Sequence, residues 1–243
     1  IADLERIRET LEIERWMLVG GSWGSTLAVA YAETYPQRVS GMVLRAVFLG
    51  TAEECIWAFE GAARQFRPEL WRAFTELLPK AERGDPVAAW GKRMESGNAA
   101  KRRGAGWVWH DYERALSELV PENEALPDSL KAAAAREGEP SSPYFEWHYM
   151  ARDFFLEPGQ LLKRAGRLKD IPGHIIQGRY DLLCPPATAE ALAHAWGENC
   201  RLEIVPGSGH SAGEPAIASA LVKAVDDMGR RLAKALPSVT ICS

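Results

Sequence analysis

The sequence predicts an α/β fold, in which a mostly parallel sheet is flanked by helices and carries an inserted helical cap. Two features of the sequence support this prediction. Short apolar runs of strand length alternate with helical periodicity in the first 50 residues and again after residue 157. The long segment between them is dominated by helical periodicity and is divided by Gly and Pro breaks. A chain of 243 residues, 47% of them apolar, is long enough for one such domain with an insertion.

The first half of the core is expected to form a helix followed by a β-turn-α-β unit. Leu4, Ile7 and Leu11 recur at helical spacing, which predicts an amphipathic helix that covers one face of the sheet. The apolar run at 16–19 predicts a buried parallel strand, because such strands are covered on both faces. A helix over 25–35 stops before Pro36, and the next strand is expected at 42–48.

The second half repeats the same alternation after the cap. The expected elements are a strand at 174–176, a helix at 187–196, a strand at 202–205 and a closing helix at 214–236. We therefore assign residues 1–50 and 157–236 to the core, 51–156 to the cap and 237–243 to a tail.

Composition and charge exclude several classes of function. A net charge of -4 and a pI near 5.8 give no reason to expect binding to nucleic acid or to an anionic membrane surface, and the basic run 101–103 is best read as a solvated helix face. No apolar run approaches the roughly 18 residues of a membrane span. The oligomeric state is left open.

The cysteines argue against a disulfide framework and against a metal site. The chain has four widely separated cysteines and no Cys-x-x-Cys or Cys/His ligand spacing: Cys55, Cys184, Cys200 and Cys242. We therefore expect no metal and no cofactor. A reducing, cytoplasmic location fits this pattern, although a signal peptide upstream of Ile1 stays open.

A Gly-x-Ser-x-Gly pattern at 20–24 lies between the first predicted strand and the helix after it. In that position the glycines permit a tight turn that exposes the Ser22 hydroxyl at the sheet edge. The backbone N–H of Trp23, at the helix N-terminus, is then placed to face a developing oxyanion. The pattern predicts Ser22 as a nucleophile; the alternative is an incidental serine in a glycine-rich turn.

A serine nucleophile needs a histidine base that is oriented by a carboxylate, here in the order Ser, Asp or Glu, His. Asp181 follows the predicted strand at 174–176, and His210 follows the strand at 202–205. Ligand sites of open parallel sheets gather at these strand ends. We therefore predict Ser22, Asp181 and His210 as a catalytic triad.

At these residues the sequence resembles the proline iminopeptidase (prolyl aminopeptidase) family of α/β-hydrolases. The resemblance runs nearly end to end and rests on four segments: Gly20 to Ala28, Met42 to Arg45, Gly178 to Asp181 with Cys184-Pro185, and Ser208 to Ser211 with Glu214-Pro215. It implies an enzyme that releases N-terminal proline from peptides, with the three triad residues in their expected roles.

The same resemblance extends into the cap and implies a substrate-binding role for two glutamates. Glu113, in Trp109-His110-Asp111-Tyr112-Glu113, and Glu146, in Phe145-Glu146-Trp147-His148-Tyr149, match the positions that receive the substrate's charged N-terminus in the family. Phe48 matches an apolar wall of the proline pocket. Without the resemblance, the glutamates read as solvated helix charges and Phe48 as an ordinary core residue.

The sequence departs from the family pattern at both ends. The family's His-Gly-Gly-Pro-Gly loop, which supplies the second oxyanion donor, has no counterpart here, and 237–243 matches no family segment. We therefore expect the first strands of the fold to be absent from this chain. We also expect the fragment by itself to be nearly inactive, since one lost donor costs roughly 100- to 1000-fold in rate.

Two other functions stay open. The first keeps the fold and the triad but acts as an esterase, an amidase or a broader aminopeptidase. The second is a catalytically inactive fragment that lacks the oxyanion loop.

Overall fold

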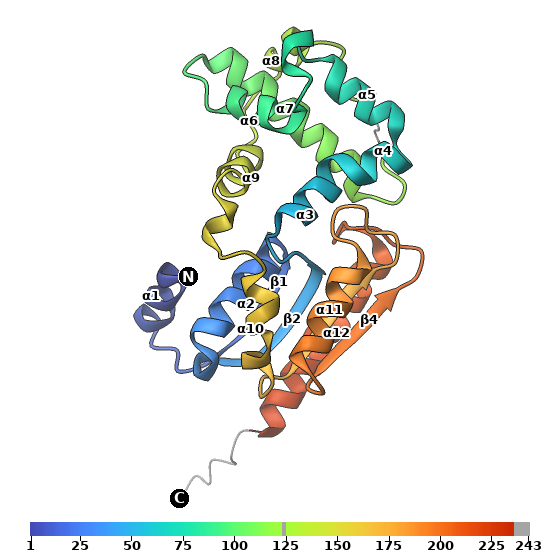
Figure 1. Ribbon diagram of the computed structural model, residues 1–243. Helices are drawn as coiled ribbons and strands as arrows, with labels where there is room; N and C mark the ends of the chain where they lie inside the picture. Colours follow the sequence, from blue (N-terminus) through green and yellow to red (C-terminus); the bar gives the residue numbers. More distant parts are fainter. Residues whose placement is uncertain (123–124, 236–243) are drawn as a thin grey trace, which may run out of the picture. The chain divides into compact units, whose positions relative to one another are not determined.

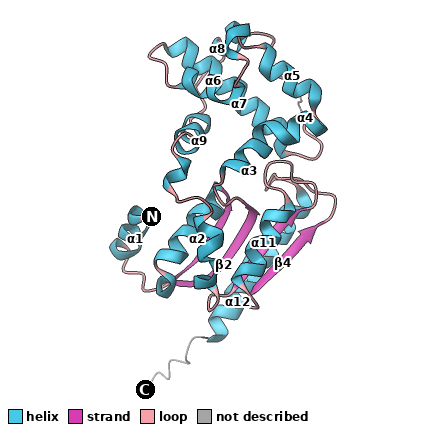
Figure 2. Cartoon of the chain, viewed as in Figure 1, coloured by secondary structure: helices cyan, strands magenta, loops and turns pink. Residues whose placement is uncertain are grey.

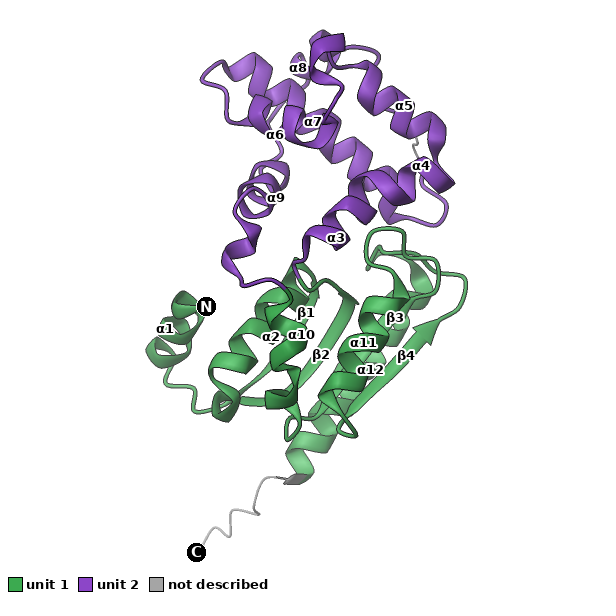
Figure 3. Ribbon diagram, viewed as in Figure 1, with its two compact units in different colours: residues 1–49, 159–243 green, residues 50–158 purple. Residues whose placement is uncertain are grey.

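The computed structural model describes residues 1–122 and 125–235 (Figure 1). The chain divides into two compact units (Figure 3). Unit 1 comprises Ile1–Leu49 and Gly159–Ser243, and unit 2 comprises Gly50–Pro158. The tail expected at 237–243 lies outside the described residues.

Unit 1 is built on a four-stranded sheet in the order β1-β2-β3-β4. The strands of this sheet are magenta in Figure 2. The strands are β1 (Trp16–Ser22), β2 (Val39–Val47), β3 (Gly173–Gly178) and β4 (Cys200–Val205). Each strand pairs in parallel with its neighbour. Because all four run in the same direction, their carboxyl ends lie along one edge of the sheet. The predicted α/β class is therefore confirmed.

Four helices of unit 1 lie close to their predicted positions: α1 (Ala2–Thr10), α2 (Trp23–Thr34), α11 (Pro186–Trp196) and α12 (Pro215–Ala235). Three short helices were not predicted: η1 (Pro36–Arg38), α10 (Gln160–Arg164) and η5 (Ala165–Leu168). The predicted end of the closing helix, Leu236, lies outside the described residues. The first strand extends to Ser22 rather than ending at Val19, so the nucleophile position is itself the last residue of β1.

Different helices cover the two faces of the sheet. Val43 and Ile176 form a core cluster with Met228 of α12 on one face. Leu44 and Ile175, one residue away along the same strands, point to the opposite face because side chains alternate along a strand. Both are fully buried, and α2 and α11 contact the sheet as well. Burial on both faces fits the apolar runs of β2 and β3. The prediction of a buried strand at 16–19 is wrong in this respect, because β1 is only half-buried and its Val19 is 57% exposed.

Helix α1 differs from its prediction. Ile7 and Leu11, expected to cover the sheet, are 49% and 60% exposed. The helix is instead attached to α2 by a polar contact, in which the buried Tyr31 hydroxyl donates to Glu5 at 2.5 Å. Within α1, Arg8 pairs with Glu5 at 2.7 Å. The hydrogen bond from Arg8 lowers the pKa of Glu5 to about 2. The helical spacing was right, but the apolar stripe is not what holds α1 in place.

The described residues of unit 2 form helices joined by loops and contain no strand. Its elements are α3 (Ala52–Ile56), a π-helical turn η2 (Trp57–Gly61), α4 (Ala62–Phe66), α5 (Pro68–Glu76), η3 (Lys80–Glu82), α6 (Pro86–Met94), α7 (Ala99–Ser117), α8 (Leu130–Ala134), α9 (Ser142–Met150) and η4 (Asp153–Phe155). Side-chain caps begin several of them: Asp85 accepts from Ala88 N–H before α6, and Asn98 accepts from Lys101 N–H before α7.

Helix α7 is the centre of unit 2 because its apolar face carries large aromatic side chains. Tyr112 stacks on Phe74 of α5 at 3.9 Å between ring centroids, and its hydroxyl donates to the Phe59 carbonyl at 2.7 Å. Trp109 packs against Phe59 at 4.6 Å between centroids. Both α7 rings are fully buried. Packing of this kind fixes the rotation of α7 and hence the direction in which its polar residues point.

Glu33, near the end of α2, is a buried carboxyl group with a direct consequence for stability. It is 2% exposed, and burial raises its pKa to about 7, although Arg164 opposes the shift. A carboxyl whose pKa is higher in the folded state than in the unfolded state weakens folding as pH rises from about 4.5 to 7. The penalty above pH 7 is about 3 kcal/mol for a shift of this size.

Glu33→Gln is therefore expected to stabilise the protein by up to about 3 kcal/mol at pH 8 and to have little effect at pH 4.5. Urea denaturation at the two pH values measures this difference. Glu190→Gln, at an exposed position of α11, serves as the control and should behave alike at both. An equal effect of Glu33→Gln at the two pH values would show that folding does not raise the pKa of its carboxyl.

Candidate active site

The turn between β1 and α2 holds Ser22 in an unusual backbone conformation. Ser22 has φ = 54° and ψ = -122°, and it precedes Trp23, the first residue of α2. A positive φ is uncommon for a residue with a side chain and marks stored strain at functional sites. A Cβ on Gly20 would lie 2.3 Å from the Gly24 carbonyl oxygen, so glycine is required there. The Gly-x-Ser-x-Gly pattern thus reports a sharp strand-to-helix turn.

Ser25 ties this turn to the end of β2. Its hydroxyl donates to the Ser22 carbonyl at 2.6 Å and accepts from the Phe48 N–H at 3.1 Å. The Phe48 carbonyl in turn accepts from the Thr26 hydroxyl at 2.7 Å. The structure therefore brings the half-buried Phe48 to the turn through its backbone. Its role as a pocket wall stays a prediction.

Asp181 and His210 form a hydrogen-bonded pair at the same edge of the sheet. His210 Nδ1 lies 3.0 Å from each carboxylate oxygen of Asp181, and both side chains are buried. A carboxylate can only accept, so this contact places the proton on Nδ1 and leaves the Nε2 lone pair to act as a base.

The Asp181 carboxylate is held by three donors. Its oxygens accept from the N–H groups of Leu183 at 3.0 Å and Cys184 at 2.8 Å, and from the Gln177 amide at 3.2 Å. Donors of this kind stabilise the ionised form and fix its orientation. Asp181 is thereby preorganised to orient the imidazole ring.

The loop that carries His210 is fixed at its backbone. Arg45 of β2 donates to the His210 carbonyl, and the Gly209 N–H donates to the Glu214 carboxylate at 2.8 Å. Burial lowers the pKa of Arg45, while the charge of Asp181 opposes that shift. A Cβ on Gly178 would lie 1.9 Å from the Gly209 carbonyl oxygen, so the loop packs directly on the end of β3.

Ser22 is therefore the last residue of β1, and Asp181 and His210 follow the ends of β3 and β4, all within unit 1. Hydrogen bonds join Asp181 to His210. Among the residues that the structure describes, no hydrogen bond joins the Ser22 hydroxyl to His210. Catalytic hydrogen bonds are often long in unliganded enzymes and tighten when substrate binds.

Within unit 2 the structure brings together the two glutamates predicted to bind substrate. Glu113 of α7 and Glu146 of α9 lie close to each other, and both are half-buried. The Trp109 indole N–H donates to Glu146 Oε2 at 2.8 Å. Burial, followed by the Glu146 charge, raises the pKa of Glu113 well above its usual value. These carboxyl groups are therefore not the solvated helix charges that local sequence suggests.

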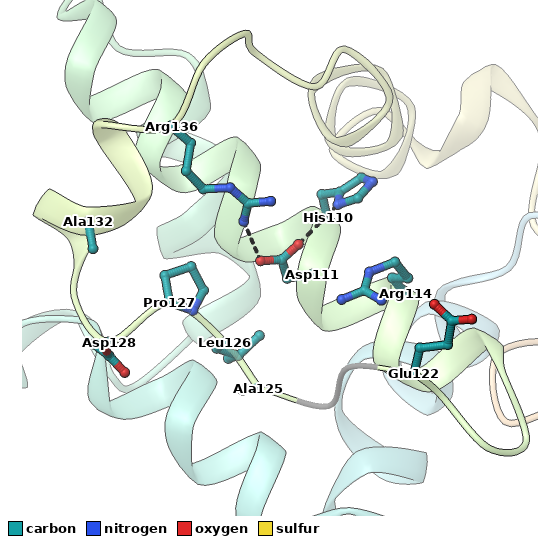
Figure 4. Close-up of a pocket in the computed structure, with 10 residues that line it drawn as sticks. All are labelled: His110, Asp111, Arg114, Glu122, Ala125, Leu126, Pro127, Asp128, Ala132 and Arg136. Carbon is teal, nitrogen blue, oxygen red and sulfur yellow. Dashed lines mark hydrogen bonds and ion pairs between the residues drawn. The ribbon is translucent and has the colours of Figure 1, made fainter.

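A separate pocket of about 570 Å³ lies elsewhere in unit 2 (Figure 4). Asp111 in its wall accepts from Arg136 at 2.5 Å and contacts His110 at 3.2 Å. Arg136 also covers the Trp107 ring at 3.8 Å. None of the site residues predicted from the sequence lines this pocket. These contacts indicate no particular ligand.

Sequence reasoning missed four residues that support the predicted ones: Gln177, Arg45, Glu214 and Trp109. Three of them occur inside the segments that carried the family resemblance, but only the structure gives them a contact. Gln177 precedes its segment by one residue. The signal that could have identified Gln177 is that it is a polar residue in a strand whose residues are all buried.

The described residues hold no group of three or more His, Cys, Asp or Glu side chains that is able to bind a metal ion. Within the same residues, every helix is too short or too polar to span a bilayer.

Comparison with known protein families gives a match over most of the chain. The family model described as the alpha/beta hydrolase fold matches residues 1–215. Similar solved structures include an alpha/beta hydrolase from a Medee basin deep-sea metagenome library, with a TM-score of 0.53 and 16% identity over 94% of this chain and 70% of that chain. A hydrolase from Bacillus anthracis has a TM-score of 0.53 and 18% identity over 97% of this chain and 72% of its own. At such identities the likeness shows the fold alone.

Relatives of known name are more similar in sequence. A proline iminopeptidase of Xylella fastidiosa is 40% identical over 235 residues, which are 93% of this chain and 71% of the relative. That of Xanthomonas citri is 40% identical over 228 residues, with the same coverage of 93% and 71%. That of Arabidopsis thaliana is 38% identical over 234 residues, 94% of this chain but 59% of the relative. The chain therefore spans between three fifths and about seven tenths of the length of these relatives.

Proposed function

The chain belongs to the proline iminopeptidase family of α/β-hydrolases, and from that premise we propose that it is a serine aminopeptidase that releases N-terminal proline from peptides. The resemblance predicted from the sequence is thereby confirmed. The identity of the catalytic residues and of the substrate-binding residues is our proposal. The substrate is a peptide with a free N-terminal proline, and the protein acts without a metal or cofactor.

In this proposal His210 Nε2 removes the proton from the Ser22 hydroxyl, which attacks the carbonyl carbon of the proline residue. The Trp23 N–H stabilises the oxyanion of the tetrahedral intermediate. The C–N bond then breaks, His210 gives its proton to the leaving amine, and an acyl-enzyme remains on Ser22. Water, deprotonated by His210, attacks the ester and releases proline. Asp181 keeps Nδ1 protonated and stabilises the imidazolium at each step.

Glu113 and Glu146 receive the positively charged N-terminus of the substrate, and Phe48 forms an apolar wall for the proline ring. The contact between the two glutamates is the observation that favours an aminopeptidase over an esterase. Two carboxyl groups held together in a partly buried place form a site for a cation, because an unpaired ammonium in a closed site costs several kcal/mol. An ester without an amine gains nothing from them.

A cytoplasmic location also belongs to this proposal. It is supported by the described cysteines Cys55, Cys184 and Cys200, which form no disulfide bond with one another.

Three substrates test the function in the full-length protein. We expect rapid hydrolysis of a proline arylamide and slow hydrolysis of its N-acetylated form, which has no ammonium group for the glutamates. A small neutral ester is expected to react slowly but measurably through the same triad. The measurement is kcat/KM for each. Equal rates on the free and acetylated arylamides would contradict an aminopeptidase and leave a serine hydrolase of broader specificity.

A further inference from the structure

We propose that Gln177 of β3 is a positioning residue for the triad: its side-chain amide holds one oxygen of the Asp181 carboxylate and thereby fixes the orientation of His210. The inference rests on the proposed catalytic roles of Asp181 and His210, whereas the contacts that carry it do not. Gln177 is fully buried, in a strand whose residues are all buried. A buried amide lowers stability unless it is hydrogen-bonded, so its partners indicate what it does.

The two oxygens of the Asp181 carboxylate are held by different parts of unit 1. Oδ1 accepts from the backbone N–H groups of Leu183 at 3.0 Å and Cys184 at 2.8 Å, which belong to the same loop as Asp181. Oδ2 accepts from Gln177 Nε2 at 3.2 Å. Within the described part of the chain, the other hydrogen bond of Oδ2 is with His210. Gln177 is therefore the residue that ties this carboxylate to the sheet.

The amide nitrogen of Gln177 also holds the loop that carries Asp181. It donates to the Cys184 carbonyl at 2.9 Å and lies 3.3 Å from the Gly178 carbonyl oxygen. Cys184 thus contacts this network twice, because its N–H donates to Asp181 while its carbonyl accepts from Gln177. The hydrogen bonds form a closed ring between strand, carboxylate and loop. A carboxylate that is held at both oxygens keeps one rotamer.

The oxygen of the same amide has no partner. Gln177 Oε1 is buried and makes no hydrogen bond within the residues that the structure describes. The reverse orientation of the amide would bring Oε1 against three acceptors, the carbonyls of Gly178 and Cys184 and the carboxylate of Asp181. A buried acceptor without a donor lowers stability. Position 177 therefore provides a donor to Asp181 although the fold is weakened by it, which is typical of a functional residue.

The orientation of Asp181 in turn determines that of the imidazole ring. His210 Nδ1 lies 3.0 Å from each oxygen of Asp181, so a rotation of the carboxylate would either move the ring or break a contact. Arg45 and Glu214 hold the His210 loop at its backbone, through the His210 carbonyl and the Gly209 N–H. They do not hold the carboxylate. A displacement of about 1 Å in a catalytic group is enough to lower a rate by about 100-fold.

Gln177→Met removes the donor and keeps the length of the side chain. In the full-length protein it should lower kcat for a neutral ester and for a proline arylamide by about 10- to 100-fold and leave KM within about twofold, because only the orientation of the base is lost. Ile175→Val is the matched control, since Ile175 is fully buried on the same face of the same strand. It should retain the parental kcat. Parental kcat in Gln177→Met would overturn the proposal.

Urea denaturation distinguishes this role from a purely structural one. Gln177→Met also removes the buried Oε1, which offsets the lost hydrogen bonds, so its denaturation midpoint should stay close to that of the parent. Ile175→Val loses a buried methyl group and should have a slightly lower midpoint. A midpoint of Gln177→Met far below that of Ile175→Val would mean that Gln177 supports the fold and not the triad.

A double-mutant cycle tests whether Gln177 acts through Asp181. If it does, Gln177→Met has no carboxylate to orient in the Asp181→Ala protein and should lower the residual kcat on the ester by less than about twofold. An equal loss in the two backgrounds would contradict the proposal. Gln177→Asn, whose amide is one methylene too short to reach Asp181, should behave like Gln177→Met and replaces it if that variant does not fold.

Proton NMR tests the contact without turnover. The Nδ1 proton of His210, identified by its absence in His210→Ala, should exchange with solvent about tenfold faster or more in Gln177→Met than in the parent or in Ile175→Val, because the carboxylate that binds it is released. Unchanged exchange would overturn the inference even in an active peptidase. Faster exchange in a protein that hydrolyses the ester but no proline arylamide would support the inference and contradict only the proposed function.

Discussion

Ser22→Ala is expected to lower kcat/KM of the full-length protein on a proline arylamide by about 10⁴-fold or more, because no other group replaces the nucleophile. His210→Ala and Asp181→Ala are expected to cause losses of comparable size. The losses should not add, since the three side chains act as one unit. Steady-state kinetics of the single and double variants measure this.

Ser40→Ala, a serine of β2 outside the site, provides the control and should retain the parent rate. Active-site titration with an acylating reagent should label the parent at one serine and leave Ser22→Ala unlabelled. Turnover of the Ser22→Ala protein within tenfold of the parent would show that the nucleophile lies elsewhere.

Gly178→Ala is expected to lower both stability and activity, by about 3 kcal/mol and about 100-fold. The added methyl group would lie 1.9 Å from the Gly209 carbonyl oxygen and 2.8 Å from that of Ser208. These are backbone atoms, so the loop that carries His210 must move. A displacement of about 1 Å in a catalytic group is enough for a loss of that size. Urea denaturation and kcat/KM are the two measurements.

Gly229→Ala is the matched control for this change. Its added methyl group meets no atom within 4 Å, and the residue lies within α12, where alanine is the better helix former by about 1 kcal/mol. This variant should be equally active and slightly more stable than the parent. A Gly178→Ala protein with parental stability would show that the His210 loop does not pack on β3 as described.

The sequence by itself determined the order of strands and helices in unit 1 and the placement of polar residues at the strand ends. Alternating apolar runs and helical segments encode that order, because a parallel strand must be apolar on both faces. The turn at Ser22 was also predictable, since Gly20 and Gly24 flank it at a spacing that has a mechanical meaning. Asp181 and His210 were then predicted from the order Ser, Asp or Glu, His and from their positions after predicted strands.

Only the tertiary structure decided which distant side chains meet and in what state of charge. The contact of Glu113 with Glu146 depends on how α7 and α9 pack, and the helical periodicity of the sequence does not predict such a contact. In the same way, the hydrogen bond from Tyr31 to Glu5 attaches α1 to α2, whereas Ile7 and Leu11 are exposed, and burial raises the pKa of Glu33. Local pattern determines which residues share a face, whereas desolvation and partner charges exist only once the faces are packed.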